Sequence, residues 1–309
     1  MRNRILYYGL IVPLSHLPFS VLYVLSDILF LVLYYAIGYR KKVIRENIRR
    51  SFPERSTKKL KTIEKEFFRH FADLLVESLK TFTISQKESL RRVKIVNTDV
   101  VNNLYDQGKN ITTIGGHNGN WELYATACAM QVKPDVAALY TPLSSPFFDK
   151  IMRQSRSRYG LQMIPTIEND KLPTDSGSPT MFIFGIDQCP RKSQKAYWME
   201  FLNQETGVQF GAEKFARDHN TAVVFGNIRK LKRGYYEIEY SLICEDPSTK
   251  PVGWIMESGT KRLEKMIKQQ PAYWLWSHKR WKYPKEEYDQ FREKKSDGVL
   301  TGSELIESQ

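Results

Sequence analysis

A long apolar stretch near the N-terminus constrains this chain more than any other feature. Residues 5–39 read ILYYGLIVPLSHLPFSVLYVLSDILFLVLYYAIGY, and residues 17–37 contain only Asp27 as a side chain charged at neutral pH. A helix needs about 20 apolar residues to cross the hydrocarbon core of a bilayer. The tyrosines in this stretch and the basic residues directly after it are typical of membrane interfaces. We therefore expect residues 1–40 to form a membrane anchor.

Two other interpretations of this stretch have less support. A cleaved signal peptide begins with basic residues, as MRNR does, but its apolar region spans roughly 7 to 15 residues, and this one is far longer. A buried core helix would be broken in its first half by Pro13 and Pro18, and its second half is apolar all round. The heavier basic flank follows the stretch, so the positive-inside rule keeps the following residues in the cytoplasm.

The charge of the chain indicates an anionic partner. Its 309 residues include 47 Lys and Arg against 34 Asp and Glu, a formal net charge of +13. Nucleic acid, an acidic carrier protein and a membrane surface would each fit this charge. The three cysteines are far apart and form no CxxC pair, so the sequence signals neither a disulfide framework nor a thiolate zinc site.

The segments on either side of the central region are helical or charged. The segment 41–92 begins within the basic stretch RKKVIRENIRRSFPE (residues 40–54), which is either a solvated face or a contact for anionic headgroups. Apolar residues then recur three or four apart from Leu60 to Leu79, as in an amphipathic helix. Residues 285–309 are charged and poor in core residues, and we expect a loosely held tail.

Residues 93–284 have the pattern of an α/β domain. Short apolar runs such as NITTIGG, VAALY, TMFIFGID and AVVFGNI alternate with helical stretches such as FFDKIMRQSRSRYG and GAEKFARDHN. This alternation predicts a sheet covered by helices on both faces. The run AVVFGNI and the run YYEIEYSLI flank KRG and predict a hairpin, so we expect a mixed sheet.

The stretch IGGHNGNWELYA, residues 114–125, lies between an expected strand and an expected helix. Such crossovers are where α/β folds usually bind ligands, and Gly115 and Gly116 allow a sharp turn and close approach. Asn120 is a candidate N-cap. In a loop that leads into a first helical turn, His117 can fold back towards Glu122. A carboxylate on one imidazole nitrogen fixes the tautomer and makes the other nitrogen a better base.

The chemistry that fits is a direct proton transfer. No obvious side-chain nucleophile accompanies His117, so it would take a proton from a substrate hydroxyl, whose oxygen attacks an activated carbonyl. The alternative is a histidine that is only a cap or core partner, since a bare H-x4-E spacing arises by chance. Neither HExxH nor a third ligand is present, so we expect no metal. We interpret Cys128 as a core residue rather than an acyl-carrying nucleophile.

The stretch GGHNGNWE resembles the H-x4-[DE] motif of the lysophospholipid acyltransferase superfamily, in particular the bacterial lipid A acyltransferases that add lauroyl or myristoyl chains. The resemblance extends, in the family's order, to NIRRSFPE, YTPLSSPFFDKIMRQSRSRYG, FGIDQ, GAEKFA and PAYWLWSHKRWK. Together these motifs span most of residues 5–283. The implied fold is a glycerolipid acyltransferase-like mixed sheet flanked by helices, with an N-terminal membrane helix.

The resemblance also implies roles for particular residues. His117 would be the general base and Glu122 its partner or a co-catalyst. An arginine of RQSRSRYG would hold anionic substrate or the developing oxyanion, with Arg156 the first candidate and Arg153 and Arg158 as alternatives. The further substrate-binding residues would be Asn118, Asp187 and Gln188. Without the resemblance, RQSRSR is a solvated helix face and FGIDQCP is a strand end with a turn-forming aspartate.

The implied activity is O-acyl transfer at a membrane. An acyl thioester, on acyl carrier protein or coenzyme A, would donate its chain to a hydroxyl of a lipid A precursor at the cytoplasmic face of the cell inner membrane. No other cofactor is expected. Another lipid acceptor, such as an aminolipid or a glycerophospholipid, is an alternative, and so is a membrane-tethered binding protein without turnover.

Two features bear on the edges of the site. WLWSHKRWK mixes aromatic and basic residues, which suits nucleic acid or a membrane interface; the membrane anchor favours the interface over nucleic acid, and a purely structural role is as consistent with the pattern. Many relatives have a Phe-Phe-Gly-like turn after the Asp-Gln motif, whereas this chain reads WMEFLNQETG. This departure leaves the local pocket wall, and with it the acyl length or the acceptor, open.

Overall fold

The computed structural model describes residues 2–166, 172, 177–194 and 196–296. Its centre is a mixed sheet of seven strands in the order β1-β9-β8-β2-β5-β3-β4. Strands β8, β2, β5, β3 and β4 are parallel, while β9 is antiparallel to β8 and parallel to β1. The strands of this sheet are β1 (Val93–Ile95), β2 (Ile111–Gly115), β3 (Asp135–Tyr140), β4 (Leu161–Pro165), β5 (Thr180–Gly185), β8 (Ala222–Lys232) and β9 (Tyr235–Cys244).

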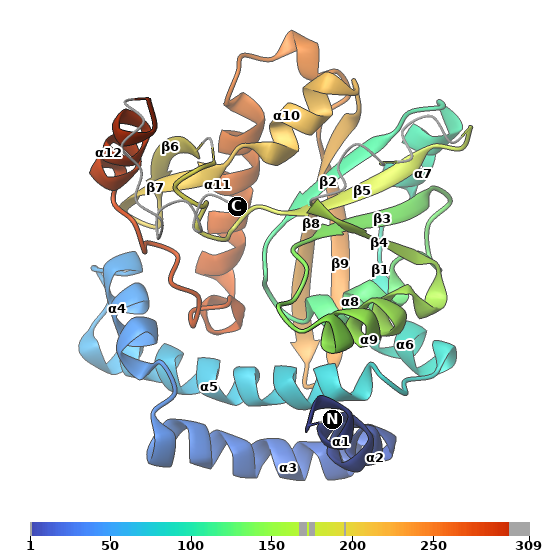
Figure 1. Cartoon of the computed structure of the whole chain (residues 1–309), viewed down its shortest axis with the longest axis vertical. Coiled ribbons are helices and arrows are strands. Elements are labelled where there is room, and N and C mark those ends of the chain that lie inside the picture. The colour runs from blue at the N-terminus through green and yellow to red at the C-terminus, as the bar shows by residue number, and fades with distance from the viewer. Residues whose placement is uncertain (1, 167–171, 173–176, 195, 297–309) are drawn as a thin grey trace.

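Helices cover both faces of this sheet. Alternate residues of β8 enter different clusters: Val223 and Phe225 pack with apolar residues of α11 (Trp254–Gln269), whereas Val224 packs with residues of α7 and α8. Figure 1 shows α11 beside the sheet and α8 and α9 close together beneath it. The remaining helices of this part are α6 (Gln86–Arg92), α7 (Asp99–Asp106), α8 (Trp121–Ala127), α9 (Pro146–Arg156) and α10 (Gly211–Asp218). The predicted mixed α/β sheet is confirmed.

Two hairpins extend the fold. Strands β8 and β9 are joined by a tight turn in which Gly234 has a φ of 74°, so the predicted hairpin around KRG is confirmed. The departing stretch WMEFLNQETG forms a separate two-stranded sheet of β6 (Ala196–Phe201) and β7 (Gln204–Gln209). Its two loop residues, Leu202 and Asn203, have φ values of 52° and 60°, as a type I′ turn requires.

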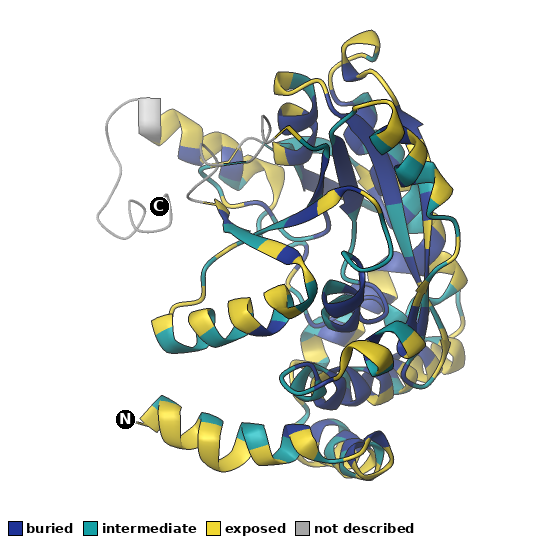
Figure 2. Ribbon diagram, turned by 90° about the vertical axis from the view of Figure 1, so that its right-hand side faces the viewer, coloured by how far each residue is buried: buried dark blue, intermediate teal, exposed yellow. Residues whose placement is uncertain are grey.

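The N-terminal residues form a layer of helices beneath the sheet (Figure 1). Helix α3 (Phe19–Leu31) continues through a π-helical segment, Val32–Ile37, and runs beside α5 (Thr57–Lys80). The stretch Phe19–Ile37 is long and apolar enough to cross a membrane. One side packs into the core through Phe30 and Leu33, while its other side is exposed and apolar, as at Val24 and Ile28. Figure 2 shows that exposed residues also run along the helical segment that begins at the N-terminus and leads into this stretch. Helices α1 (Arg2–Leu6) and α2 (Val12–His16) precede it, with a π-helical segment, Tyr7–Ile11, between them.

Asp27 illustrates how a charge can occur in this apolar helix. Its carboxylate accepts a hydrogen bond of 2.7 Å from Nη2 of Arg233, which lies in the β8–β9 turn. The charge of Asp27 is therefore balanced by a cation of the protein, although its side chain is largely exposed.

The basic stretch after the apolar helix forms α4 (Lys41–Ser51). Ile44 and Ile48 are buried on one side, while Arg45, Arg49 and Arg50 are exposed on the other. The expected C-terminal tail begins with α12 (Lys285–Ser296), in which Tyr288 and Phe291 are buried. The expectation of a loosely held tail is wrong for this part, because two aromatic residues three apart give the helix a face that packs on the domain.

Candidate active site

The pairing of β2 with β5 brings His117 and Asp187 together. These strands are parallel neighbours, with Gly115 in register with Gly185, and each polar residue lies two positions further on. Asp187 therefore lies beside His117 at the carboxyl ends of the strands. Nδ1 of His117 is 2.6 Å from Oδ1 of Asp187, and the backbone N–H of His117 donates to Oδ2 at 2.7 Å. The fold thus builds an aspartate–histidine pair from two separate stretches of sequence.

Glycines make this close packing possible. A Cβ atom on Gly116 would lie 2.6 Å from a methyl carbon of Leu263 and 3.0 Å from Oδ2 of Asp187. A Cβ atom on Gly185 would lie 3.0 Å from Cε1 of His117. Any other residue at these positions would push the imidazole or the carboxylate aside. Gly116 and Gly185 therefore allow neighbouring side chains to pack closely against the backbone. A left-handed backbone conformation is not the reason, because the residue of loop 116–120 with a positive φ is Gly119, at 61°.

The loop 116–120 is held by hydrogen bonds from several directions. The backbone N–H of Leu275 donates to the carbonyl of His117, and that of Gly119 donates to the carbonyl of Tyr273. The side-chain oxygen of Asn120 accepts from the N–H of Leu123 at 2.9 Å, so the predicted N-cap of α8 is confirmed. This loop can therefore hold the imidazole in one orientation.

The environment of the pair sets its protonation. Asp187 is 3% exposed and also accepts a hydrogen bond of 2.7 Å from Nε1 of Trp274. Burial raises the pKa of Asp187, but the interaction with His117 and these hydrogen bonds outweigh burial and lower this pKa to about 2. Burial lowers the pKa of His117, but the Asp187 carboxylate outweighs this and leaves the pKa raised. Because the carboxylate can only accept, Nδ1 carries the proton and Nε2 of the neutral ring is free to accept one.

The sequence predicted a different carboxylate for His117, and that pairing is wrong. Glu122 is the second residue of α8, and its carboxylate binds the guanidinium of Arg156 through Nε at 2.9 Å and Nη2 at 2.6 Å. It also accepts from Nε1 of Trp121 at 3.1 Å. Asp187 occupies Nδ1 of His117 instead, because the strand order places the end of β5 against the loop. Glu122 remains near enough for its charge to favour the protonated form of His117.

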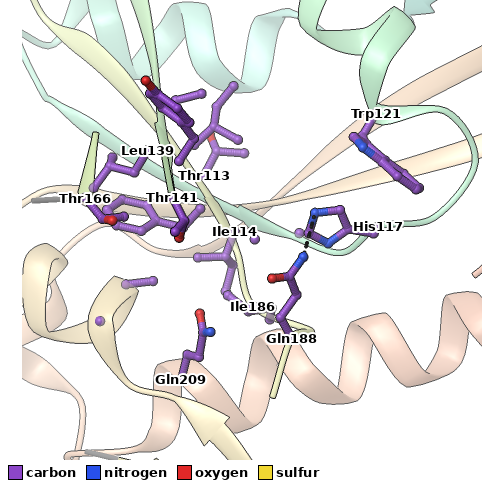
Figure 3. A pocket seen from close by; sticks show the side chains of 18 of the residues that line it. Thr113, Ile114, His117, Trp121, Leu139, Thr141, Thr166, Ile186, Gln188 and Gln209 are labelled. Carbon is purple, nitrogen blue, oxygen red and sulfur yellow. Dashed lines mark hydrogen bonds between the residues drawn. The ribbon is translucent and has the colours of Figure 1, made fainter. Parts of the chain in front are cut away.

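A cavity of about 1090 Å³ opens in front of His117. This volume reaches the upper end of the range of roughly 300–1,000 Å³ that is usual for ligand sites. Figure 3 shows the amide of Gln188 directed at the ring of His117, with Nε2 of each 3.4 Å apart, and Trp121 on the other side of the ring. Much of the wall is apolar, including Ala138, Leu139, Leu161, Met163, Ile183 and Phe184. The site combines a histidine base with room for a long apolar group.

The remaining predicted residues are divided between the cavity and its surroundings. Arg156 and Arg153 line the cavity, so this part of RQSRSR is not simply a solvated face. The guanidinium of Arg158 lies elsewhere and donates to the carbonyl of Phe82. Asn118 is fully buried, and its amide nitrogen donates to the carbonyl of Ile228 at 2.9 Å, so it holds the loop.

Two other predictions concern buried residues. Trp274 and Trp276 are 1% and 0% exposed, so the membrane-interface interpretation of WLWSHKRWK is wrong for them, and the structural alternative holds. Composition alone could not separate a membrane interface from a packed core, because aromatic residues occur in both.

Cys128 is buried, and burial raises the pKa of its thiol to about 12, which agrees with a core residue. In the described parts of the chain, no three His, Cys, Asp or Glu side chains are grouped to hold a metal ion.

Sequence reasoning missed the residues that support the loop from behind. His70 and Glu77 lie on α5; Nε2 of His70 is 3.0 Å from the carbonyl of Gly119, and Glu77 accepts from the amide of Asn120 at 2.6 Å. One signal was available: both interrupt the apolar stripe of an amphipathic helix at positions that face the protein. Trp274 was noticed only as part of a composition, and not as a donor to Asp187.

Comparison with known proteins agrees with this geometry. Residues 3–283 match the model of a family described as bacterial lipid A biosynthesis acyltransferase. The match covers most of the chain and includes the apolar helix, the loop around His117 and the end of β5. The chain belongs to this family and is an acyltransferase. A search of curated proteins found no match. The family and the apolar helix fit association with a membrane.

Proposed function

We propose that this protein transfers a fatty acyl chain from acyl carrier protein to a hydroxyl of a lipid A precursor, with His117 as the general base. The observation that carries this proposal is the His117 ring, held through Nδ1 by Asp187 with Nε2 beside the cavity. Family membership supports acyl transfer and lipid A biosynthesis. The net charge of +13 suits both an acidic carrier protein as the donor and a phosphorylated lipid as the acceptor.

The reaction proceeds by direct attack. Nε2 of His117 removes the proton of the acceptor hydroxyl as its oxygen bonds to the thioester carbonyl carbon. The carbonyl oxygen becomes an oxyanion, which a nearby hydrogen-bond donor stabilises. Collapse of this intermediate breaks the carbon–sulfur bond, and the proton on His117 passes to the departing thiolate. The products are the acylated lipid and the free carrier thiol, and His117 returns to its neutral form.

Two side chains can serve the oxyanion. Gln188 lies against Nε2 of His117, so its amide is close to the reacting atoms. Arg156 lines the cavity and uses Nε and Nη2 to bind Glu122, so its Nη1 is the nitrogen left to donate to an oxyanion. We assign Glu122 the role of holding this guanidinium, which differs from the direct partnership with His117 that the motif implied.

The position of the site suits a lipid acceptor. The exposed apolar side of residues 19–37 would lie in the bilayer, and the exposed arginines of α4 would meet anionic headgroups. The heavier basic flank follows the apolar helix, which favours the cytoplasmic side of the inner membrane. The acyl chain would occupy the apolar part of the cavity.

A labelled acyl-carrier assay tests this proposal. We expect His117→Ala to lower transfer by about 10²–10⁴-fold, the usual contribution of a general base. His16→Ala is the matched control, because His16 is an exposed histidine on α2, and it should keep full transfer. Full transfer by a folded His117→Ala protein would refute the assignment of the base.

The acceptor is tested separately by offering purified enzyme a lipid A precursor, a glycerophospholipid and an aminolipid in parallel. We expect mass spectrometry to show an added acyl chain on the lipid A precursor. Exclusive acylation of either other lipid would replace the proposed acceptor and leave the role of His117 in place.

A further inference from the structure

A second cavity lies beside the first one, on the other side of the turn that follows β5. It has a volume of about 740 Å³ and is lined by residues of α4, the β6–β7 hairpin, the segment after Trp276 and the start of α12. Gln188 lines the first cavity, whereas the next two residues, Cys189 and Pro190, line the second. The two cavities therefore meet at this turn. The side chain of His278 fixes it, since Nε2 accepts from the N–H of Cys189 at 2.9 Å.

Arg280 lines this second cavity, and its side chain has no hydrogen-bond or ion-pair partner among the described residues. The residue is 2% exposed, and its Nε has no hydrogen-bond partner among the described residues. Neither a side-chain hydrogen bond nor an ion pair joins its guanidinium to another described residue, and its Cζ lies 6.0 Å from the centre of the Phe201 ring. Burial lowers the pKa of Arg280, yet an arginine does not give up its proton in a protein. The Asp187 carboxylate favours the charged form of Arg280 from a longer range than an ion pair, but Asp187 is already paired with His117. A bound anion would therefore lower the remaining cost of burying this cation.

The rest of the lining agrees with an anionic ligand. Arg49, Arg50 and Lys285 add three more basic side chains, against one exposed carboxylate, Glu205. Arg49 and Arg50 share the single carboxylate of Glu46, so their charge is only partly balanced. Aromatic side chains, including Trp198 and Tyr288, supply apolar surface for the organic part of a ligand.

We propose that this second cavity is a phosphate-binding site, with the guanidinium of Arg280 at its base and the basic residues of α4 at its rim. A guanidinium matches the geometry of phosphate oxygens, and several cations suit a dianion better than a single carboxylate. Because the site adjoins the turn that carries Asp187 and Gln188, its phosphate belongs to a substrate of the reaction. It is either the phosphate on the sugar of the acceptor or the phosphate of the pantetheine arm of the carrier. This last step rests on the proposed function, whereas the phosphate site does not.

Thermal unfolding of the full-length protein in detergent, followed by tryptophan fluorescence, tests the site with inorganic phosphate. We expect the Tm to rise with phosphate and to saturate, relative to chloride at the same ionic strength. Arg280→Gln should weaken the apparent phosphate affinity by at least about tenfold, which corresponds to about 1.4 kcal/mol. Arg280→Lys keeps the charge but loses the forked donor geometry of the guanidinium, so it should give an intermediate phosphate affinity. Arg91→Gln removes an exposed arginine, paired with Glu88, and should leave the response unchanged.

The phosphate-free proteins give an independent readout. If the guanidinium of Arg280 is unpaired until an anion binds, Arg280→Gln should leave the Tm in the absence of phosphate unchanged or raised. A Tm that falls on this substitution would assign Arg280 to the stability of the fold and overturn the proposal. Unchanged phosphate affinity in Arg280→Gln would overturn it as well.

Parallel titrations identify the source of the phosphate. Glucosamine 1-phosphate should bind more tightly than inorganic phosphate if the acceptor supplies the group, and 4′-phosphopantetheine should do so if the donor supplies it. Tighter binding of neither would overturn the assignment to a substrate. His117→Ala should retain the phosphate response, so that failure of the acyl transfer proposal and failure of this site remain distinguishable.

Discussion

A histidine lies on each side of the loop 116–120, and the surroundings of the two histidines shift their pKa values in opposite directions. On the cavity side, His117 is paired with the ionised Asp187 and its pKa is raised. On the side of α5, His70 is 3% exposed, Nζ of Lys230 lies 3.2 Å from its Nδ1, and its pKa is well below the usual value, because burial and this cation both disfavour a second charge. The Asp187 carboxylate favours the protonated form of His117, whereas burial and the Lys230 cation keep His70 neutral. The proposed catalysis uses the side that faces the cavity, while the other side holds the loop in place.

The largest expected effect comes from Asp187→Asn. An amide at this position can no longer stabilise the imidazolium or demand the Nδ1–H tautomer, so kcat should fall by about 10²–10⁴-fold. The base must be neutral to act, and losing the carboxylate lowers the pKa of His117. The acid limb of the kcat/KM profile should therefore move to lower pH than in the wild type.

A pH series on Asp187→Asn and Glu122→Gln checks which carboxylate dominates. If Glu122→Gln moved the acid limb further than Asp187→Asn, the pairing seen in the structure would not describe the active enzyme.

The next largest effect concerns the α5 side. The carboxylate of Glu77 is fully buried and accepts hydrogen bonds from Tyr23, Asn120 and Tyr236. Glu77→Ala would leave these donors unsatisfied and should cost about 3 kcal/mol in the free energy of unfolding. Burial raises the pKa of Glu77, which favours its neutral form, so Glu77→Gln should cost far less. Thermal unfolding in detergent compares the two; equal losses would mean that these hydrogen bonds are not the cause.

A smaller effect on turnover is expected from Arg156→Lys. Lysine keeps the charge but cannot form the two parallel bonds that Arg156 makes with Glu122. We expect about a tenfold loss of kcat/KM, with little change in stability. If Glu122 acts through Arg156, the double variant with Glu122→Gln should be no worse than the poorer single variant, and additive losses would show that the two act separately.

The smallest expected effect is that of Tyr23→Phe. This substitution removes one hydrogen bond of 3.0 Å to Glu77 at the contact between α3 and α5. The free energy of unfolding should fall by about 1 kcal/mol. Transfer activity should be unchanged, because two other donors still hold Glu77; a clear loss of activity would show that α3 contributes to the loop beyond stability.

The sequence correctly indicated the loop that carries His117 but not the carboxylate that pairs with His117, and the reason is physical. The strand, the glycine pair, His117 and the N-cap Asn120 are local features, and local sequence determines them. The choice of Asp187 over Glu122 depends on which strand lies beside β2. That neighbour is β5, which is not adjacent in the chain, and spacing along the sequence cannot reveal it.

The burial of Trp274 and of the unpaired guanidinium of Arg280 could not be predicted from the sequence for a similar reason. Aromatic and basic residues suit several environments, and only the packing of distant segments decides between them. The apolar helix was easier to predict, because a run of apolar residues has few soluble alternatives. Its single charge, Asp27, finds a partner in Arg233 only because the β8–β9 turn lies against α3.

The hydrogen bonds that join the loop 116–120 to Tyr273 and Leu275 also have a consequence for the order in which this protein matures. The apolar helices precede Tyr273 and Leu275 in the chain and are therefore synthesised before the segment that closes the loop. During synthesis, the chain can therefore meet the membrane long before His117 is fixed. A nascent or C-terminally truncated chain that lacks this segment would have the apolar helices but no hydrogen bonds from Tyr273 and Leu275 to hold His117 in place.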